Sequence, residues 1–162
     1  MSHARPLLQL GKDLDRGSSN AQTEDSTFAP ARPPAGDECR DFYIERHGVR
    51  YAGIHLIVDL YGADRIDELD HVKATLEACV EAAGATLLHI HLHHFNPNNG
   101  ISGVAVLAES HISIHSWPER RYAALDVFMC GDAQPHKTIP VLRRAFTPDR
   151  TVVAEHLRGR RL

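Results

Sequence analysis

Hydrophobic residues recur in regular patterns from about Gly48 onward, and the folded part of the chain is predicted to begin there. Residues 51–61 are rich in β-branched and aromatic side chains, which is typical of a strand. A helix is expected next, with Asp67 as its cap and Gly84 at its end. Its apolar positions recur at steps of three and four residues: Leu69, Val72, Leu76, Val80 and Ala83.

The same patterns predict further strands and a second helix. Strands are expected at residues 86–95, 104–107, 111–116, 122–129 and 151–157, and a helix is expected at 135–146. The predicted order is therefore strand, helix, four strands, helix, strand. Two helices packed on one face of a largely antiparallel sheet bury these apolar faces most simply, so we expect an α+β fold, a two-layer sandwich.

Residues 1–47 are predicted to be a disordered or linker-like N-terminal extension. Between Arg16 and Phe28 the only large apolar side chain is Phe28, and three prolines and a glycine follow within residues 30–36. Such a segment buries too little apolar surface to offset the entropy of ordering it. The expected organisation is this extension followed by one domain over residues 48–162.

Composition and charge exclude several classes of protein. The chain has 162 residues, of which 43% are hydrophobic and 24% charged, and its net charge is −3. This balance gives no electrostatic reason to expect nucleic acid or an anionic membrane as partner. No apolar run approaches the roughly 20 residues of a membrane span. The three cysteines form no CxxC pair and suggest neither a disulfide framework nor a thiolate zinc site, so we expect a cytoplasmic protein.

Histidines alternate along the predicted strand 86–95. One face of that strand carries His89, His91 and His93. The other face, expected to be buried, carries Leu88, Ile90 and Leu92. Imidazoles on one face can share a zinc ion, but no Asp, Glu or Cys in the run completes such a site. We expect no metal, and a histidine-based metal-binding protein or metal enzyme is kept as a distant alternative.

The richest chemistry lies in the segment 109–119, which reads ESHISIHSWPE. It offers a hydroxyl nucleophile with a nearby base, the pattern used in acyl transfer. On a straight strand Ser110 and His115 face opposite sides, because their separation is odd, so they meet only where the strand bends, bulges or is cut. Cys130 ends the strand 122–129 beside Gly131, where a side chain can reach a cleft. A lone cysteine is otherwise most often a small buried hydrophobe.

Together these residues resemble the S-adenosylmethionine decarboxylase proenzymes of the short prokaryotic, pyruvoyl-dependent type. The resemblance covers about residues 48–157. Its specific part is the segment 109–119, with Phe95-Asn-Pro and Gly100-Ile-Ser-Gly103 upstream and Cys130 downstream.

The resemblance implies that the enzyme makes its own cofactor, a covalent pyruvoyl group derived from Ser110. The Ser110 hydroxyl would attack the Glu109 carbonyl and give an ester. Loss of the Ser110 α-proton would then eliminate the Glu109 carboxylate and leave dehydroalanine, whose hydrolysis releases ammonia. Cleavage between Glu109 and Ser110 would produce the chains 1–109 and 110–162.

The resemblance also assigns the groups that assist each step. In processing, His115 would transfer the α-proton of Ser110. Ser102 would support the oxyanion of the tetrahedral intermediate, because that charge must be stabilised by a hydrogen-bond donor. In decarboxylation, the substrate amine would form a Schiff base at residue 110, and this supplies an electron sink. Cys130 would then be the proton donor that returns a proton to carbon.

Substrate binding is assigned by the same resemblance to Phe95, Trp117 and Glu119. The two aromatic rings would flank the adenine of S-adenosylmethionine, and the carboxylate would accept hydrogen bonds from the ribose hydroxyls. The family also implies a homodimer of cleaved protomers, with active sites between protomers and a role in spermidine synthesis.

Two alternatives use the same scaffold. A pyruvoyl-dependent arginine or ornithine decarboxylase would need the same machinery without an adenosine pocket, and the sequence Trp117-Pro118-Glu119 favours the nucleoside substrate. A catalytically inactive regulatory partner is disfavoured, because Ser102, Ser110, His115 and Cys130 are all present.

Overall fold

The computed structural model describes residues 44–46 and 48–160. Most of the predicted N-terminal extension, residues 1–43 and 47, lies outside the described residues. A small antiparallel hairpin comes first, formed by β1 (Ile44–Arg46) and β2 (Val49–Tyr51). The strand β1 therefore precedes Gly48, the residue at which the sequence pattern placed the start of the folded part.

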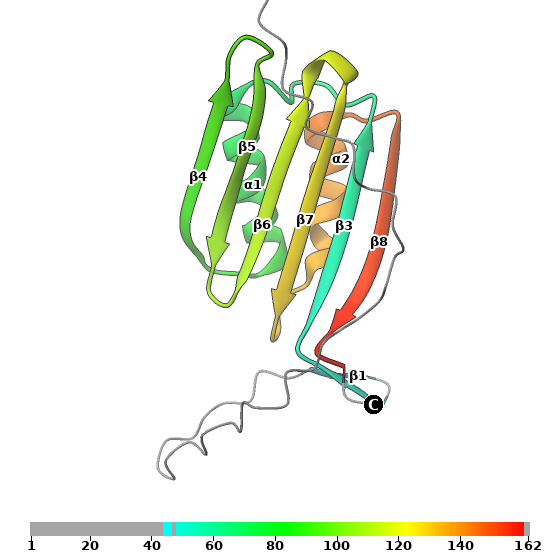
Figure 1. The fold of residues 1–162 in the computed structure, drawn as a ribbon. Coiled ribbons are helices and arrows are strands. Elements are labelled where there is room, and N and C mark those ends of the chain that lie inside the picture. The colour runs from blue at the N-terminus through cyan, green and yellow to red at the C-terminus, as the bar shows by residue number, and fades with distance from the viewer. Residues whose placement is uncertain (1–43, 47, 161–162) are drawn as a thin grey trace, which may run out of the picture. The chain divides into compact units, whose positions relative to one another are not determined.

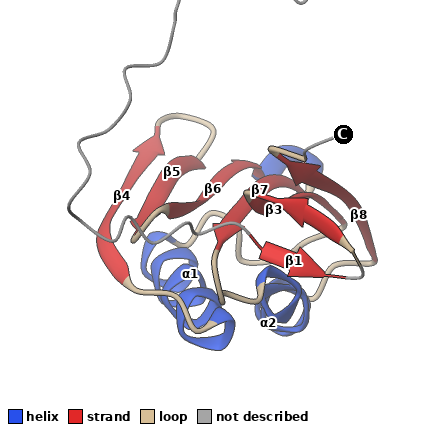
Figure 2. Ribbon diagram, turned by 90° about the horizontal axis from the view of Figure 1, so that it is seen from below, coloured by secondary structure: helices blue, strands red, loops and turns tan. Residues whose placement is uncertain are grey.

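A six-stranded antiparallel sheet and two helices make up the main body (Figure 1). Across the sheet, the strands are β4 (Leu87–Phe95), β5 (Gly100–Leu107), β6 (Ser110–Trp117), β7 (Tyr122–Cys130), β3 (Gly53–Tyr61) and β8 (Arg150–Arg158). The helices are α1 (Leu69–Ala83) and α2 (Thr138–Phe146), and short 3-10 turns, η1 (Pro118–Arg120) and η2 (Pro135–Lys137), precede β7 and α2. Figure 2 shows both helices on the same face of the sheet. The predicted two-layer α+β sandwich is confirmed.

The core lies between the sheet and the helices because the central strands β3, β6 and β7 alternate buried and more exposed side chains. Along β3, for example, Ile54, Leu56, Val58 and Leu60 face the helices and are buried. Helix α1 contributes Val72 and Leu76 to this layer, and helix α2 contributes Leu142 and Phe146. Burying each large apolar side chain stabilises the fold by roughly 1.5–3 kcal/mol, which is why the helices remain on this face.

The structure corrects two details of the sequence pattern. Helix α1 is preceded by Glu68 in the capping position rather than Asp67, although it ends at Gly84 with φ 71° as expected. Leu88 is 64% exposed rather than buried, because the register of β4 and β5 shifts between Leu87 and His89. The bulge adds one residue to β4, so Leu87 takes the inward place that alternation had assigned to Leu88.

We call the face of the sheet turned away from α1 and α2 the open face. Both described helices lie on the other side of the sheet (Figure 2). His89, His91 and His93 lie on the open face, as predicted, since the strand register sets them beside outward residues of β5. Large apolar side chains on this face are 36–48% exposed: Ile57, Tyr61, Phe95, Val106 and Trp117.

Gly103 is required by the close approach of β4 and β5. A Cβ at this position would overlap the backbone carbonyl oxygen of His91 and lie 2.8 Å from Leu92 Cα. We expect Gly103→Ala to lower the free energy of unfolding by about 1–3 kcal/mol in urea denaturation, because backbone atoms must move. Val106→Ala on the same strand removes an exposed side chain and is the control. Equal stability of the two variants would contradict this packing.

Candidate active site

The turn between β5 and β6 carries a strained residue. Only Ala108 and Glu109 connect the two strands, and Glu109 has a φ of 58°. This left-handed conformation costs a residue with a Cβ roughly 1–2 kcal/mol. The strain therefore lies in Glu109. The family resemblance implies that Ser110 attacks the carbonyl carbon of this same residue.

Ser110 begins β6 directly after this turn and is buried. Because β6 and β7 are antiparallel, the end of β7 lies beside it, and the Cys130 backbone N–H donates to Ser110 Oγ at 3.1 Å. Burial raises the pKa of the Cys130 thiol, and the negative charge of Glu109 raises this pKa further. The thiol therefore holds its proton more firmly than an ordinary cysteine does.

A cavity of about 310 Å³ opens at this end of the sheet. It is lined by Glu109, Ser110 and Cys130 together with residues 84–86 and 131–133. The loop after α1 is tied to the turn, because the Ala108 N–H donates to the Thr86 carbonyl at 3.0 Å. Sequence reasoning missed the loop 84–86, since no pattern along the chain links a helix end to a turn more than twenty residues later.

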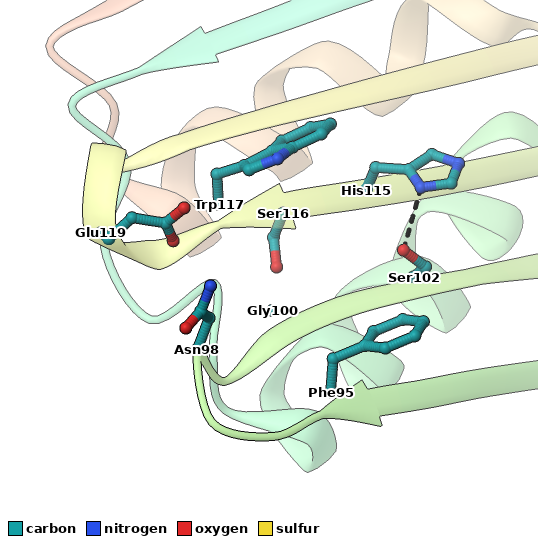
Figure 3. Close-up of a pocket in the computed structure, with 8 residues that line it drawn as sticks. All are labelled: Phe95, Asn98, Gly100, Ser102, His115, Ser116, Trp117 and Glu119. Atoms are coloured by element: carbon teal, nitrogen blue, oxygen red, sulfur yellow. Dashed lines mark hydrogen bonds between the residues drawn. The ribbon is translucent and has the colours of Figure 1, made fainter. Parts of the chain in front are cut away.

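A second cavity, of about 200 Å³, lies at the opposite end of β5 and β6 (Figure 3). Its lining residues come from β4, β5, β6 and the two connecting turns: Phe95, Asn98, Gly100, Ser102, His115, Ser116, Trp117 and Glu119. Ser102 and His115 are partners across the two strands, and Ser102 Oγ lies 2.9 Å from His115 Nδ1. The two residues that the family resemblance assigns to separate roles in processing are therefore in contact here, although the sequence analysis predicted no pair between them.

Phe95 and Trp117 flank a slot in this second cavity. Phe95 pairs with Gly100, and the register of β5 and β6 sets Trp117 beside Gly100 on its other side. Neighbouring strands are about 4.8 Å apart, so the two rings stand on strands about 10 Å apart with no side chain between them. Gly100 therefore leaves a gap between the two rings. Glu119 and Asn98 lie at its end (Figure 3), and Asn98 was read in the sequence only as part of a turn.

The predicted site residues thus fall into two groups within one chain. We call Glu109, Ser110 and Cys130 the cleavage end. We call Phe95, Ser102, His115, Trp117 and Glu119 the slot end. Ser110 faces inward and His115 outward, which confirms the predicted parity. Five residues of extended chain also separate them by about 16 Å, so Ser102 and His115 do not reach the Glu109 carbonyl of their own chain.

Neither a metal-binding group nor a membrane-spanning helix is found among the described residues. Within residues 44–46 and 48–160, no group of three or more His, Cys, Asp or Glu side chains is arranged to hold a metal ion. His89, His91 and His93 line neither of these two cavities. None of the helices in the described part of the chain is long and apolar enough to cross a membrane.

Comparison with known proteins gives a consistent result. A family model described as S-adenosylmethionine decarboxylase matches residues 54–159. A protein of Thermomicrobium roseum named S-adenosylmethionine decarboxylase proenzyme is 47% identical over 108 residues, which are 66% of this chain and 93% of that protein. A protein of the same name from Methanococcus maripaludis strain C5 is 44% identical over 114 residues, covering 68% of this chain and 93% of the relative.

Solved structures agree with this match. The crystal structure of the adenosylmethionine decarboxylase from Aquifex aeolicus superposes with a TM-score of 0.62 at 37% identity, covering 67% of this chain and 92% of that one. The matched region contains both the cleavage end and the slot end. On its sequence and its fold, the chain belongs to the S-adenosylmethionine decarboxylase family.

Proposed function

We propose that this chain is a proenzyme that cuts itself between Glu109 and Ser110 and then decarboxylates S-adenosylmethionine. The products are CO2 and decarboxylated S-adenosylmethionine, the aminopropyl donor for polyamines such as spermidine. The observation that carries the proposal is the buried Ser110 hydroxyl beside the strained Glu109, in one cavity with Cys130. Residues 48–162 would form the decarboxylase domain. The cut would divide the whole chain into residues 1–109 and 110–162.

Self-cleavage begins with the Ser110 hydroxyl. Its oxygen bonds to the Glu109 carbonyl carbon, the Glu109–Ser110 C–N bond breaks, and the nitrogen takes up the proton, which gives an ester. The α-proton of residue 110 is then removed, the Cβ–Oγ bond breaks, and Glu109 leaves as a carboxylate. Water hydrolyses the resulting dehydroalanine to a pyruvoyl group and ammonia. Breaking the peptide releases the strain at Glu109, which favours the forward direction.

The cleavage end suits a small carbonyl group at residue 110. The Cys130 backbone N–H already points at the Ser110 oxygen, and the cavity of about 310 Å³ leaves room for a substrate to approach. The pyruvoyl group supplies the electron sink that the loss of CO2 requires. Cys130 then supplies the proton to carbon, and its raised pKa keeps the thiol protonated for this step.

The slot end suits the nucleoside part of the substrate. A flat ring between Phe95 and Trp117 gains two aromatic contacts without displacing a side chain, because Gly100 lies between them. The Glu119 carboxylate at the end of the slot is an acceptor suited to the two ribose hydroxyls.

Two copies of the chain are needed to complete one site. When two open faces pack with their strands in opposite directions, the slot end of one copy meets the cleavage end of the other. His115 and Cys130 both lie on the open face, and the exposed apolar side chains there give the contact its driving force. A two-fold axis then produces two equivalent sites, each with Ser110 from one protomer and His115 from its partner. Such a dimer would work in the cytoplasm.

The arginine or ornithine alternative accounts for less of the structure. Those substrates contain no nucleobase, so the slot between Phe95 and Trp117 would serve nothing. The relatives are named for S-adenosylmethionine, and neither they nor the described residues favour a metal enzyme. Comparing CO2 release from S-adenosylmethionine, arginine and ornithine decides between the substrates.

Sharing of the site between protomers predicts complementation. Ser110→Ala and His115→Ala should each stay uncut when expressed alone, because every site lacks one required group. Co-expression should restore cleavage of the His115→Ala chain only, in at most about half of its copies if pairing is random. Mass spectrometry of the purified mixture distinguishes the chains. An uncut mixture, with each single variant also uncut, would place both residues in a site within one chain.

Cys130 is predicted to act after cleavage and not during it. Cys130→Ala should be processed normally and lose at least about 100-fold in CO2 release, because proton donation by a positioned acid contributes that much. Cys79→Ala removes the buried thiol of α1 and is the matched control, with turnover retained. In the wild type, the raised pKa of Cys130 should preserve turnover to a pH above the range of an ordinary thiol. Unchanged turnover in Cys130→Ala would remove it as the donor.

A further inference from the structure

A continuous row of side chains crosses four strands of the open face at the level of the slot. The register sets Trp117 opposite Tyr122, Tyr122 opposite Tyr61, and Tyr61 opposite Arg150. The Trp117 and Tyr122 rings are stacked, with centroids 5.3 Å apart and planes inclined by 29°. The Tyr122 and Tyr61 centroids are 5.2 Å apart, and Arg150 Cζ lies 4.2 Å from the Tyr61 centroid. The Trp117 side of the slot is therefore backed by a series of contacts that ends in a cation over a ring.

Tyr122 is held both by its ring and by its hydroxyl. Its ring lies between Trp117 and Tyr61, and its hydroxyl donates to Asp59 Oδ1 at 2.5 Å. That hydrogen bond, with burial and the Asp59 charge, raises the pKa of Tyr122 to about 12. The hydroxyl therefore remains a donor to Asp59 throughout the physiological range.

The two walls of the slot, Trp117 and Phe95, differ in the contacts that hold each ring. Trp117 is 41% exposed, yet one of its faces is covered by Tyr122. Phe95 is 48% exposed, and among the ring contacts of the described residues it meets the edge of His93, with centroids 4.4 Å apart and planes inclined by 69°. An exposed side chain without support must lose its rotational freedom when a ligand binds, and this weakens binding. Stacking on Tyr122 restricts Trp117 before any ligand arrives.

We propose that Tyr122 is a positioning residue for the substrate slot, and that it acts by holding the Trp117 indole in place through stacking. This inference rests on the proposed function, since it takes the slot to receive the adenine ring. Tyr122 touches no ligand itself. Its role is to preorganise the Trp117 wall, with Asp59 fixing the hydroxyl and Tyr61 supporting the far side of the ring.

The experiment uses the fact that Trp117 is the only tryptophan in the sequence, so fluorescence excited selectively in tryptophan, and not in the four tyrosines, reports on this wall alone. Quenching by acrylamide and titration with adenosine are measured on the wild type, Tyr122→Leu and Tyr122→Phe. In Tyr122→Leu we expect stronger quenching, and a KM for S-adenosylmethionine that is about 3- to 10-fold higher, as the loss of one aromatic pair implies, with kcat within about twofold. Tyr122→Phe keeps the stacking and should stay close to the wild type in KM.

Leu69→Ala is the control, because it shortens an exposed apolar side chain on α1, on the other side of the sheet from Trp117 and from the open face. It should leave quenching and KM unchanged. Equal quenching in the wild type and Tyr122→Leu, or a fall in kcat with KM unchanged, would overturn the positioning role. A wild-type chain that releases CO2 from no candidate substrate would count against the proposed function alone, since the quenching comparison needs no turnover.

Discussion

The register of the β5–β6 hairpin is the constraint on which the rest of the site depends. An extended strand advances about 3.3 Å per residue and alternates its side chains, so a two-residue turn fixes where every later side chain of β6 lies. Ser110 must lie beside the turn, and His115 must lie far from it on the other face. The eleven-residue segment 109–119 therefore contributes residues to both the cleavage end and the slot end. A compact motif in sequence is therefore divided between two places in the folded chain, and the proposal that a second copy completes the site starts from this division.

The remaining features of the site follow from this division. At the cleavage end, a short turn forces Glu109 into the left-handed region, and the adjacent β7 backbone holds the Ser110 oxygen. At the slot end, a glycine between two aromatic positions leaves a gap that a flat ring can enter. At both ends the ladder hydrogen bonds of the sheet hold the strand residues in register, and short turns supply the remaining lining residues.

Most of the fold could be predicted from sequence because its elements follow simple periodicities. Helix α1 and the strands β3 and β7 were found from spacing alone. Strand β5 was predicted too short, since Gly100 and Gly103 lack the side chains that signal a strand, although neighbouring strands pair with them. Leu88 was misplaced because a bulge leaves no mark in the alternation of residues. The place of Asn98 in the cavity and the stacking of Tyr122 on Trp117 were missed for a different reason, because spacing along the chain does not encode which residues meet in space.

The most direct test of the account is the intact mass of the purified protein under denaturing conditions. Self-cleavage at Glu109–Ser110 predicts two chains, residues 1–109 and 110–162, with the second lacking a free amino group at its first residue. A single uncut chain of 18.0 kDa would contradict self-cleavage at Glu109–Ser110, as would a cut at any other bond.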